Sequence, residues 1–173
     1  MDKQKLTGFV EKYSLGNTIE SVPWSIKNNT LTTNFVSADR TLLGRVTLNT
    51  FNLDDSEVGI YNTTQLQKMI SVLGNTVDIK LKKADERAIA VDMDDGDVSL
   101  NYMLADLDII PKAPKLKTIP DTTVVIKIDN DFITKFVKAK NALSESDDFT
   151  VVSNTITQVI LGESDTNTNK INI

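Results

Sequence analysis

The side chains able to do chemistry in this chain are carboxylates, hydroxyls and lysines, because the sequence has no histidine and no cysteine. Ordinary zinc sites, disulfides and histidine-dependent acid–base catalysis are therefore excluded. The densest carboxylate group is Asp92–Asp97. A calcium EF-hand loop needs glycine sixth and glutamate twelfth, but counting from Asp92 places Gly96 fifth and Met103 twelfth. The segment predicts a hairpin turn, and we expect neither a metal nor a cofactor.

The lysines recur on segments whose apolar residues have helical spacing. Three such stripes are present: Leu6, Phe9, Val10 and Tyr13; Leu66, Met69, Ile70 and Leu73; and Phe132, Phe136, Ala139 and Leu143. Each predicts an amphipathic helix with one buried face. The lysines that these helices would expose are Lys5, Lys12, Lys135 and Lys138, with Lys3, Lys68 and Lys140 as secondary candidates. Such lysines either keep a surface solvated or bind a polyanion.

The helices belong to a repeated plan of strand, helix and further strands. Val124–Ile128 alternates like a strand and leads into the third helix, with Asp129 or Asn130 as its cap. The second stripe lies 60 residues after the first, and an offset of 66 relates it to the third at three of its four positions. At that offset Met69 falls on Lys135.

The segments between the helices alternate like antiparallel strands joined by polar turns. Asn28-Asn29 predicts one hairpin turn, and Pro23 indicates an edge strand or a strand start. Trp24 is expected in the core, and residues 52–57 are expected to form an acidic loop. The fold class predicted is α+β, with repeated helix-on-antiparallel-sheet units.

A proline-rich segment divides the sequence. Pro111, Pro114 and Pro120 forbid a continuous helix or central strand there. We therefore expect a first domain at residues 1–110, a connector at 111–120 and a second domain at 121–173. Only one helix–sheet unit follows the connector, so we expect the second domain to be partial and the protein to be shortened at its C-terminus.

Composition limits the environment of the protein. The net charge is −5, and 40% of the residues are hydrophobic. The sequence has no apolar run that would span a bilayer and no signal-peptide core at its N-terminus. We expect a cytoplasmic binding protein whose contacts with nucleic acid, if it makes them, come from a local basic surface.

Three segments, in this order, carry a resemblance to a known family: Ile60–Asn75, Asn101–Pro120 and Ile126–Leu143. The sequence resembles the DNA sliding clamps, in particular the polymerase processivity factor of T-even-like bacteriophages. The resemblance implies domains of two helix–sheet repeats and a head-to-tail ring of three subunits around duplex DNA. It also implies DNA polymerase and the clamp loader as partners, and no enzymatic activity.

The resemblance also assigns roles to residues. The lysines named above would line the pore, and Ile109 and Ile110 would lie near a pocket for partner peptides, although simple packing of the connector explains them equally well. Val98, Leu100 and Tyr102 would form a subunit interface on an edge strand. Two other classes of protein are the alternatives. An enzyme would need a nucleophile–base pair or a phosphate cradle, which the sequence does not offer. A β-rich phage structural protein would not account for lysine-bearing amphipathic repeats.

Overall fold

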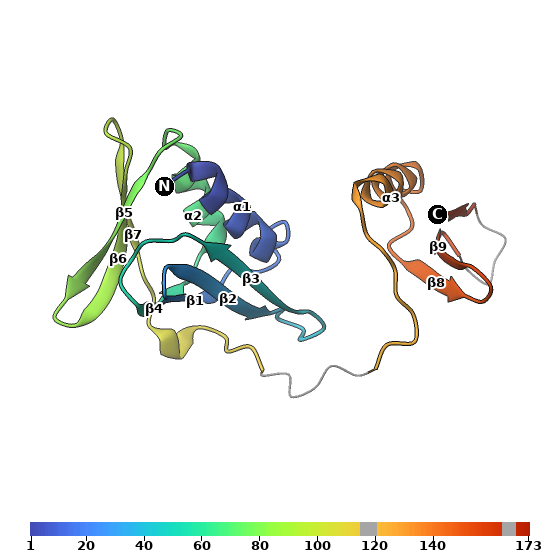
Figure 1. Cartoon of the computed structure of the whole chain (residues 1–173), viewed down its shortest axis with the longest axis horizontal. Helices are drawn as coiled ribbons and strands as arrows, with labels where there is room; N and C mark the ends of the chain where they lie inside the picture. The colour runs from blue at the N-terminus through green and yellow to red at the C-terminus, as the bar shows by residue number, and fades with distance from the viewer. Residues whose placement is uncertain (115–120, 164–168) are drawn as a thin grey trace. The chain divides into compact units, whose positions relative to one another are not determined.

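The computed structural model describes residues 1–114, 121–163 and 169–173 (Figure 1). The protein forms two compact units, Met1–Lys115 (unit 1) and Leu116–Ile173 (unit 2). The helices are α1 (Lys3–Ser14), α2 (Thr63–Ser71), the 3-10 helix η1 (Leu107–Ile109) and α3 (Asn130–Ala142). The strands are β1 (Val22–Lys27), β2 (Thr30–Val36), β3 (Leu43–Asn49), β4 (Ser56–Ile60), β5 (Asp78–Ala84), β6 (Arg87–Asp94), β7 (Ser99–Met103), β8 (Phe149–Ser153), β9 (Thr157–Leu161) and β10 (Ile171–Asn172). The predicted α+β class is confirmed.

Each α-helix begins at a side-chain cap. The cap oxygens accept hydrogen bonds from backbone amides at 2.8 to 3.0 Å: Asp2 from Gln4, Asn62 from Gln65 and Asp129 from Phe132. The caps of α2 and α3, Asn62 and Asp129, lie 67 positions apart. The caps are thus offset by one residue more than the 66 that relates the apolar stripes, and at the cap offset Met69 aligns with Phe136 instead of Lys135.

Unit 1 contains two antiparallel sheets, with strand orders β3-β2-β1-β4 and β5-β6-β7. Asn28 and Asn29 both have positive φ, as a tight hairpin turn between twisted strands requires. Pro23 lies near the start of β1 and pairs with Gly59 of β4, so β1 is a central strand and the edge alternative is wrong. The expected acidic loop is shorter than predicted because β4 already begins at Ser56.

The two halves of unit 1 exchange strands. β4, which precedes α2, pairs with β1, the first strand after α1. In return Met1, which precedes α1, exchanges backbone hydrogen bonds with Val77 just before β5. The helices run antiparallel, because Lys3 contacts the carbonyl of Ser71 while Tyr13 at the other end of α1 bonds Thr63. Each half therefore completes the sheet of the other.

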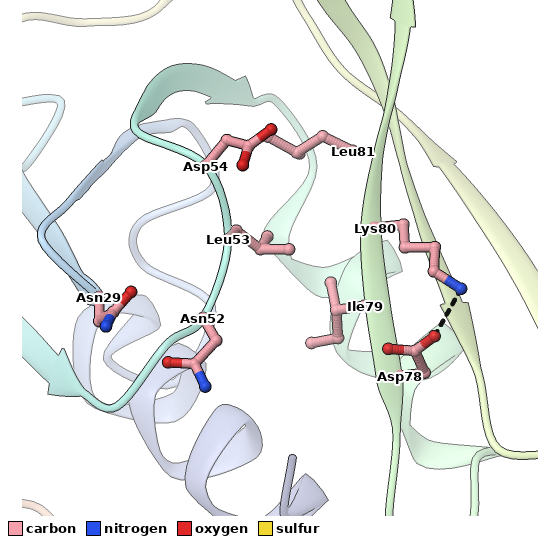
Figure 2. Close-up of a pocket in the computed structure, with 8 residues that line it drawn as sticks. All are labelled: Asn29, Asn52, Leu53, Asp54, Asp78, Ile79, Lys80 and Leu81. Atoms are coloured by element: carbon pink, nitrogen blue, oxygen red, sulfur yellow. Dashed lines mark ion pairs between the residues drawn. The ribbon is translucent and has the colours of Figure 1, made fainter.

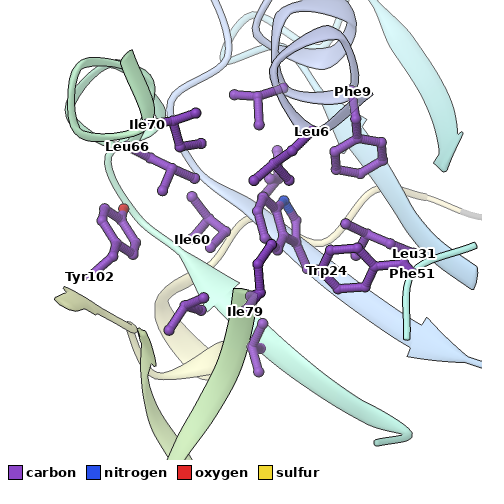
Figure 3. Packing of buried hydrophobic residues seen from close by; sticks show 14 of the residues in the cluster. Leu6, Phe9, Trp24, Leu31, Phe51, Ile60, Leu66, Ile70, Ile79 and Tyr102 are labelled. Atoms are coloured by element: carbon purple, nitrogen blue, oxygen red, sulfur yellow. The ribbon is translucent and has the colours of Figure 1, made fainter. Parts of the chain in front are cut away.

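The core of unit 1 gathers around Trp24, as predicted (Figure 3). Phe9 and Phe51 meet the indole edge-to-face, with ring centroids 5.7 and 6.5 Å away. The apolar stripes of α1 and α2 point into the same cluster. Both helices are held in place by burial of these stripes against the sheets.

Unit 2 is one three-stranded sheet, in the order β10-β9-β8, with α3 packed on it. Ala139, Leu143 and Leu161 are buried, whereas Phe132 and Phe136 are only partly buried. The predicted strand at Val124–Ile128 is wrong: within the described residues it pairs with no other strand, and Val125 and Ile128 are exposed. No helix in the described part of the protein is long and apolar enough to cross a membrane.

Candidate nucleic-acid interface

Positive charge is concentrated on the helices. The three α-helices carry seven lysines against two acidic residues, Glu11 and Asp131. The whole protein has 19 basic and 24 acidic residues, which leaves 12 basic and 22 acidic residues outside the helices. The seven helical lysines are the seven DNA-contact candidates of the sequence analysis. A net acidic protein thus has locally basic helix surfaces.

Four of the seven lysines are exposed and, among the described residues, form no ion pair: Lys5, Lys12, Lys68 and Lys138. Lys5 and Lys12 are exposed because the stripe from Leu6 to Tyr13 commits the other side of α1 to the core. A lysine with a long flexible stem can reach a phosphate while its helix stays packed. These four ammonium groups are the ones best placed to take up such contacts.

Two lysines already hold backbone carbonyls. Lys3 Nζ donates to the carbonyls of Ser71 and Leu73, where the last turn of α2 leaves oxygen atoms unpaired. Lys140 Nζ donates to the carbonyls of Ser144 and Ser146 after α3. Both side chains therefore stabilise helix ends, a use that their sequence positions do not reveal.

Lys135 differs from both groups, because it is exposed but forms an ion pair. Its Nζ is 2.7 Å from the carboxylate of Asp131 one turn earlier, and both side chains are exposed. The hydrogen bond and the charge of Asp131 raise the pKa of Lys135. The ammonium group stays fully charged, but a phosphate must compete with Asp131 for it.

The acidic turn Asp94–Asp97 forms as predicted. The Asp95 carboxylate accepts hydrogen bonds from the amides of Gly74, Asp97 and Val98, which lower its pKa. Backbone amides thus occupy the oxygens that a cation would need. In the described residues no carboxylate group is arranged to hold a metal ion.

A cavity of about 590 Å³ separates the loop at Asn52–Asp54 from the edge strand β5 (Figure 2). Its lining includes the carboxylates of Asp54 and Asp78, and its one cation, Lys80, is paired with Asp78 at 2.7 Å. This balance of charge repels phosphate. The lining therefore does not favour a nucleic acid.

β7 is an edge strand, and the hydrogen bonding shows which of its amides are open. The Leu104 amide donates to the Ile89 carbonyl at 2.9 Å. Because amides alternate sides along a strand, those of Leu100 and Tyr102 also face β6. The amides that face the open edge belong to Ser99, Asn101 and Met103.

The predicted interface residues are therefore not the ones that point outward. Tyr102 is buried, and its hydroxyl accepts from the Asn62 amide at 3.0 Å and donates to the Asn62 carbonyl at 3.1 Å. Leu100 packs against the core, and Val98 precedes the strand. Sequence alternation identifies the strand but not the direction of its amides, so it does not single out Asn101 and Met103 as positions whose amides are open.

The structure separates the two isoleucines proposed for partner binding. Ile110 is 4% exposed, and a Cβ added at Gly59 would lie 2.9 Å from its side chain. Ile109 is 62% exposed. A neighbouring cavity of about 440 Å³ is lined by Leu107 and Arg87 but by neither isoleucine. Ile110 anchors the connector to unit 1, and residues 115–120 of the connector lie outside the described residues.

The sequence matches no protein-family model and no curated protein. Solved structures are similar. PCNA from Thermococcus kodakaraensis matches with a TM-score of 0.68 at 10% identity, over all of this chain and 70% of that one. The PCNA2–PCNA3 complex from Sulfolobus tokodaii matches with a TM-score of 0.60 at 11% identity and the same coverage. The protein has a PCNA-like clamp fold. At this level of identity the similarity to the PCNA structures is one of fold.

Proposed function

We propose that this protein is a subunit of a DNA sliding clamp, a protein that holds duplex DNA without catalysing a reaction on it. The observation that carries the proposal is the segregation of charge on a clamp fold. The helices have a net charge of +5 in a protein whose net charge is −5. This arrangement attracts a polyanion to the helices. The acidic excess lies in the turns and loops, because the strands carry six basic and four acidic residues.

The chemistry of the lysines suits sliding. Ammonium groups on flexible stems contact phosphates, which repeat regularly along DNA and carry no sequence information. Neither α1 nor α2 exposes a row of amide or guanidinium side chains that would read bases. Binding of this kind retains a protein on DNA and lets it move from one phosphate to the next.

Assembly follows from the same proposal. A ring of three subunits, which the resemblance to T-even-like phage clamps implies, would use the open β7 edge for backbone pairing with a neighbouring subunit. DNA polymerase and the clamp loader would bind near the connector, where Ile109 is exposed. The protein would act in the cytoplasm of the cell that replicates the DNA.

The test compares two pairs of lysines. Lys5→Gln with Lys12→Gln removes two exposed charges from α1. The matched control, Lys80→Gln with Lys82→Gln, removes two exposed charges from β5. The affinity for a random-sequence duplex is measured by fluorescence anisotropy between about 50 and 200 mM salt.

If each helical lysine neutralises one phosphate, the slope of log affinity against log salt falls by about 1.8 in the helix variant. The control keeps the original slope. Stability should change by less than about 0.5 kcal/mol in both, because all four positions are on the surface. Equal slopes in the two variants would assign the helical lysines to solubility and would remove the support for a clamp.

A further inference from the structure

Unit 2 repeats the first half of unit 1 in register. With the caps Asp2 and Asp129 aligned, an offset of 127 continues from the helix into the first strand after it. The aligned pairs are Leu6 with Ile133, Phe9 with Phe136, Val10 with Val137, Val22 with Phe149 and Trp24 with Val151. Both units have an edge-to-face ring contact between helix and strand, although at different strand positions: Phe136 meets Phe149, the counterpart of Val22, at 5.5 Å, and Phe9 meets Trp24 at 5.7 Å.

Burial differs sharply between these equivalent positions. Leu6 and Val10 are 0% exposed, whereas Ile133 and Val137 are 48% and 50% exposed. On the strands, Val22 and Trp24 are at most 1% exposed, whereas Phe149 and Val151 are 56% and 40% exposed. The same apolar pattern is therefore covered in unit 1 and uncovered in unit 2.

Unit 1 shows what covers it there. α2 packs antiparallel on α1, β4 pairs with β1, and the segment before β5 pairs with Met1. In unit 2 the three counterpart surfaces are all open within the described residues: the Ile133–Val137 side of α3, the free edge of β8, and the extended segment Val124–Ile128. We call these three surfaces together the open face.

We propose that the open face binds the open face of a second copy of this protein, about a two-fold axis. One copy offers both parts of the exchange seen in unit 1, a pre-helix segment and a free strand edge. A two-fold operation therefore pairs Val124–Ile128 of each copy with β8 of the other and packs α3 against α3. In the dimer, each copy covers the open face of the other. In unit 1 the equivalent surfaces are covered by α2, β4 and the segment before β5.

Contacts and charges along α3 fit this arrangement. In unit 1, Tyr13 meets Thr63 and Lys3 meets Ser71. The same antiparallel alignment places Asn130 of one copy near Lys138 and Lys140 of the second. The acidic first turn of α3, with Asp131, then lies beside the basic last turn of the other copy. Lys138, which has no ion pair within the described residues, would gain one.

The proposed interface is distinct from the ring contacts. It uses neither β7 nor β10, which is the other outer strand of the unit 2 sheet. The inference therefore does not rest on the proposed function. Lys5 and Lys12 lie in unit 1, so the DNA-binding test and the dimer test can fail separately.

The test is the mass of the protein in solution, by sedimentation at micromolar concentrations. The wild-type protein should sediment at an even multiple of 19.1 kDa, and Ile133→Glu with Val137→Glu should halve that mass. The matched control is Val72→Glu, which changes a valine of unit 1 that is 63% exposed. It should leave the dimer intact.

Hydrogen exchange of the wild-type protein provides a second measurement that does not depend on a variant folding. The amides of residues 124–128 should be protected, and protection should fall on dilution as the dimer dissociates. A monomeric wild-type protein would overturn the proposal, and so would a dimer that the two glutamates leave unchanged. If a different polypeptide covers the open face with its own helix and strand, the wild-type protein alone would be monomeric.

Discussion

Asn101→Pro examines whether the β7 edge is a site of assembly. The Asn101 amide faces away from β6, so within unit 1 proline removes no ladder hydrogen bond at this position. Proline is tolerated in an edge strand when its nitrogen faces outward. If a neighbouring subunit pairs with β7, the variant loses one intersubunit hydrogen bond, worth about 0.5–1.5 kcal/mol. Association should weaken about two- to tenfold at each interface.

Two controls make this result specific. Asn101→Ala removes the side-chain hydrogen bond to Asp92 but keeps the backbone amide. Tyr102→Pro removes an amide that faces β6 and a buried ring, so it should reduce thermal stability far more than Asn101→Pro does. Sedimentation over a concentration series measures association, and thermal denaturation measures stability. Equal association of Asn101→Pro and Asn101→Ala would refute the role of this edge.

Three further predictions concern stability. Phe9→Ala should lower the free energy of unfolding by about 3–5 kcal/mol, because the ring is buried. Phe136→Ala should lower it by about 1–2 kcal/mol, because this ring is only partly buried. Equal losses in a denaturant titration would contradict this difference in burial. Tyr102→Phe should lower the free energy of unfolding by about 0.5–1.5 kcal/mol, because the Asn62 amide loses its acceptor while the Asn62 carbonyl keeps the Leu66 amide. An unchanged midpoint would contradict this. The pKa of Asp95 is held below its ordinary 3.8, so its stabilising effect is present above that pH and is lost as pH falls through the lower folded value. Melting curves of Asp95→Asn and wild type should therefore differ at neutral pH and converge in acid.

Local chemistry in the sequence predicts the helices well. The apolar stripes predict all three helices, and an Asx cap before its stripe places the start of α3, because a cap and a stripe are both encoded within a few residues. The burial of Trp24 and the turn at Asn28-Asn29 follow from equally local rules. Apolar spacing alone does not fix the offset between the repeats, because it tolerates a shift of one residue. The positions of the caps are needed as well.

The failures concern features that depend on distant partners. Val124–Ile128 alternates like a strand, but a strand forms only where a neighbour supplies hydrogen bonds, and none of the described residues does. Lys3 and Lys140 have the same residue type and helical setting as Lys5, yet each binds carbonyls brought near by the fold. The direction of the β7 amides likewise depends on which neighbour β7 pairs with.

As a sliding clamp, this protein would enclose duplex DNA by contacts with its phosphates. The most direct measurement is retention on closed circular DNA compared with the same DNA linearised, after the protein has assembled or been loaded on it, in salt high enough to screen simple attraction. A clamp predicts long residence on the circle and rapid loss from the free ends of the linear form. Equal retention on both, with the protein folded and assembled, would contradict the account.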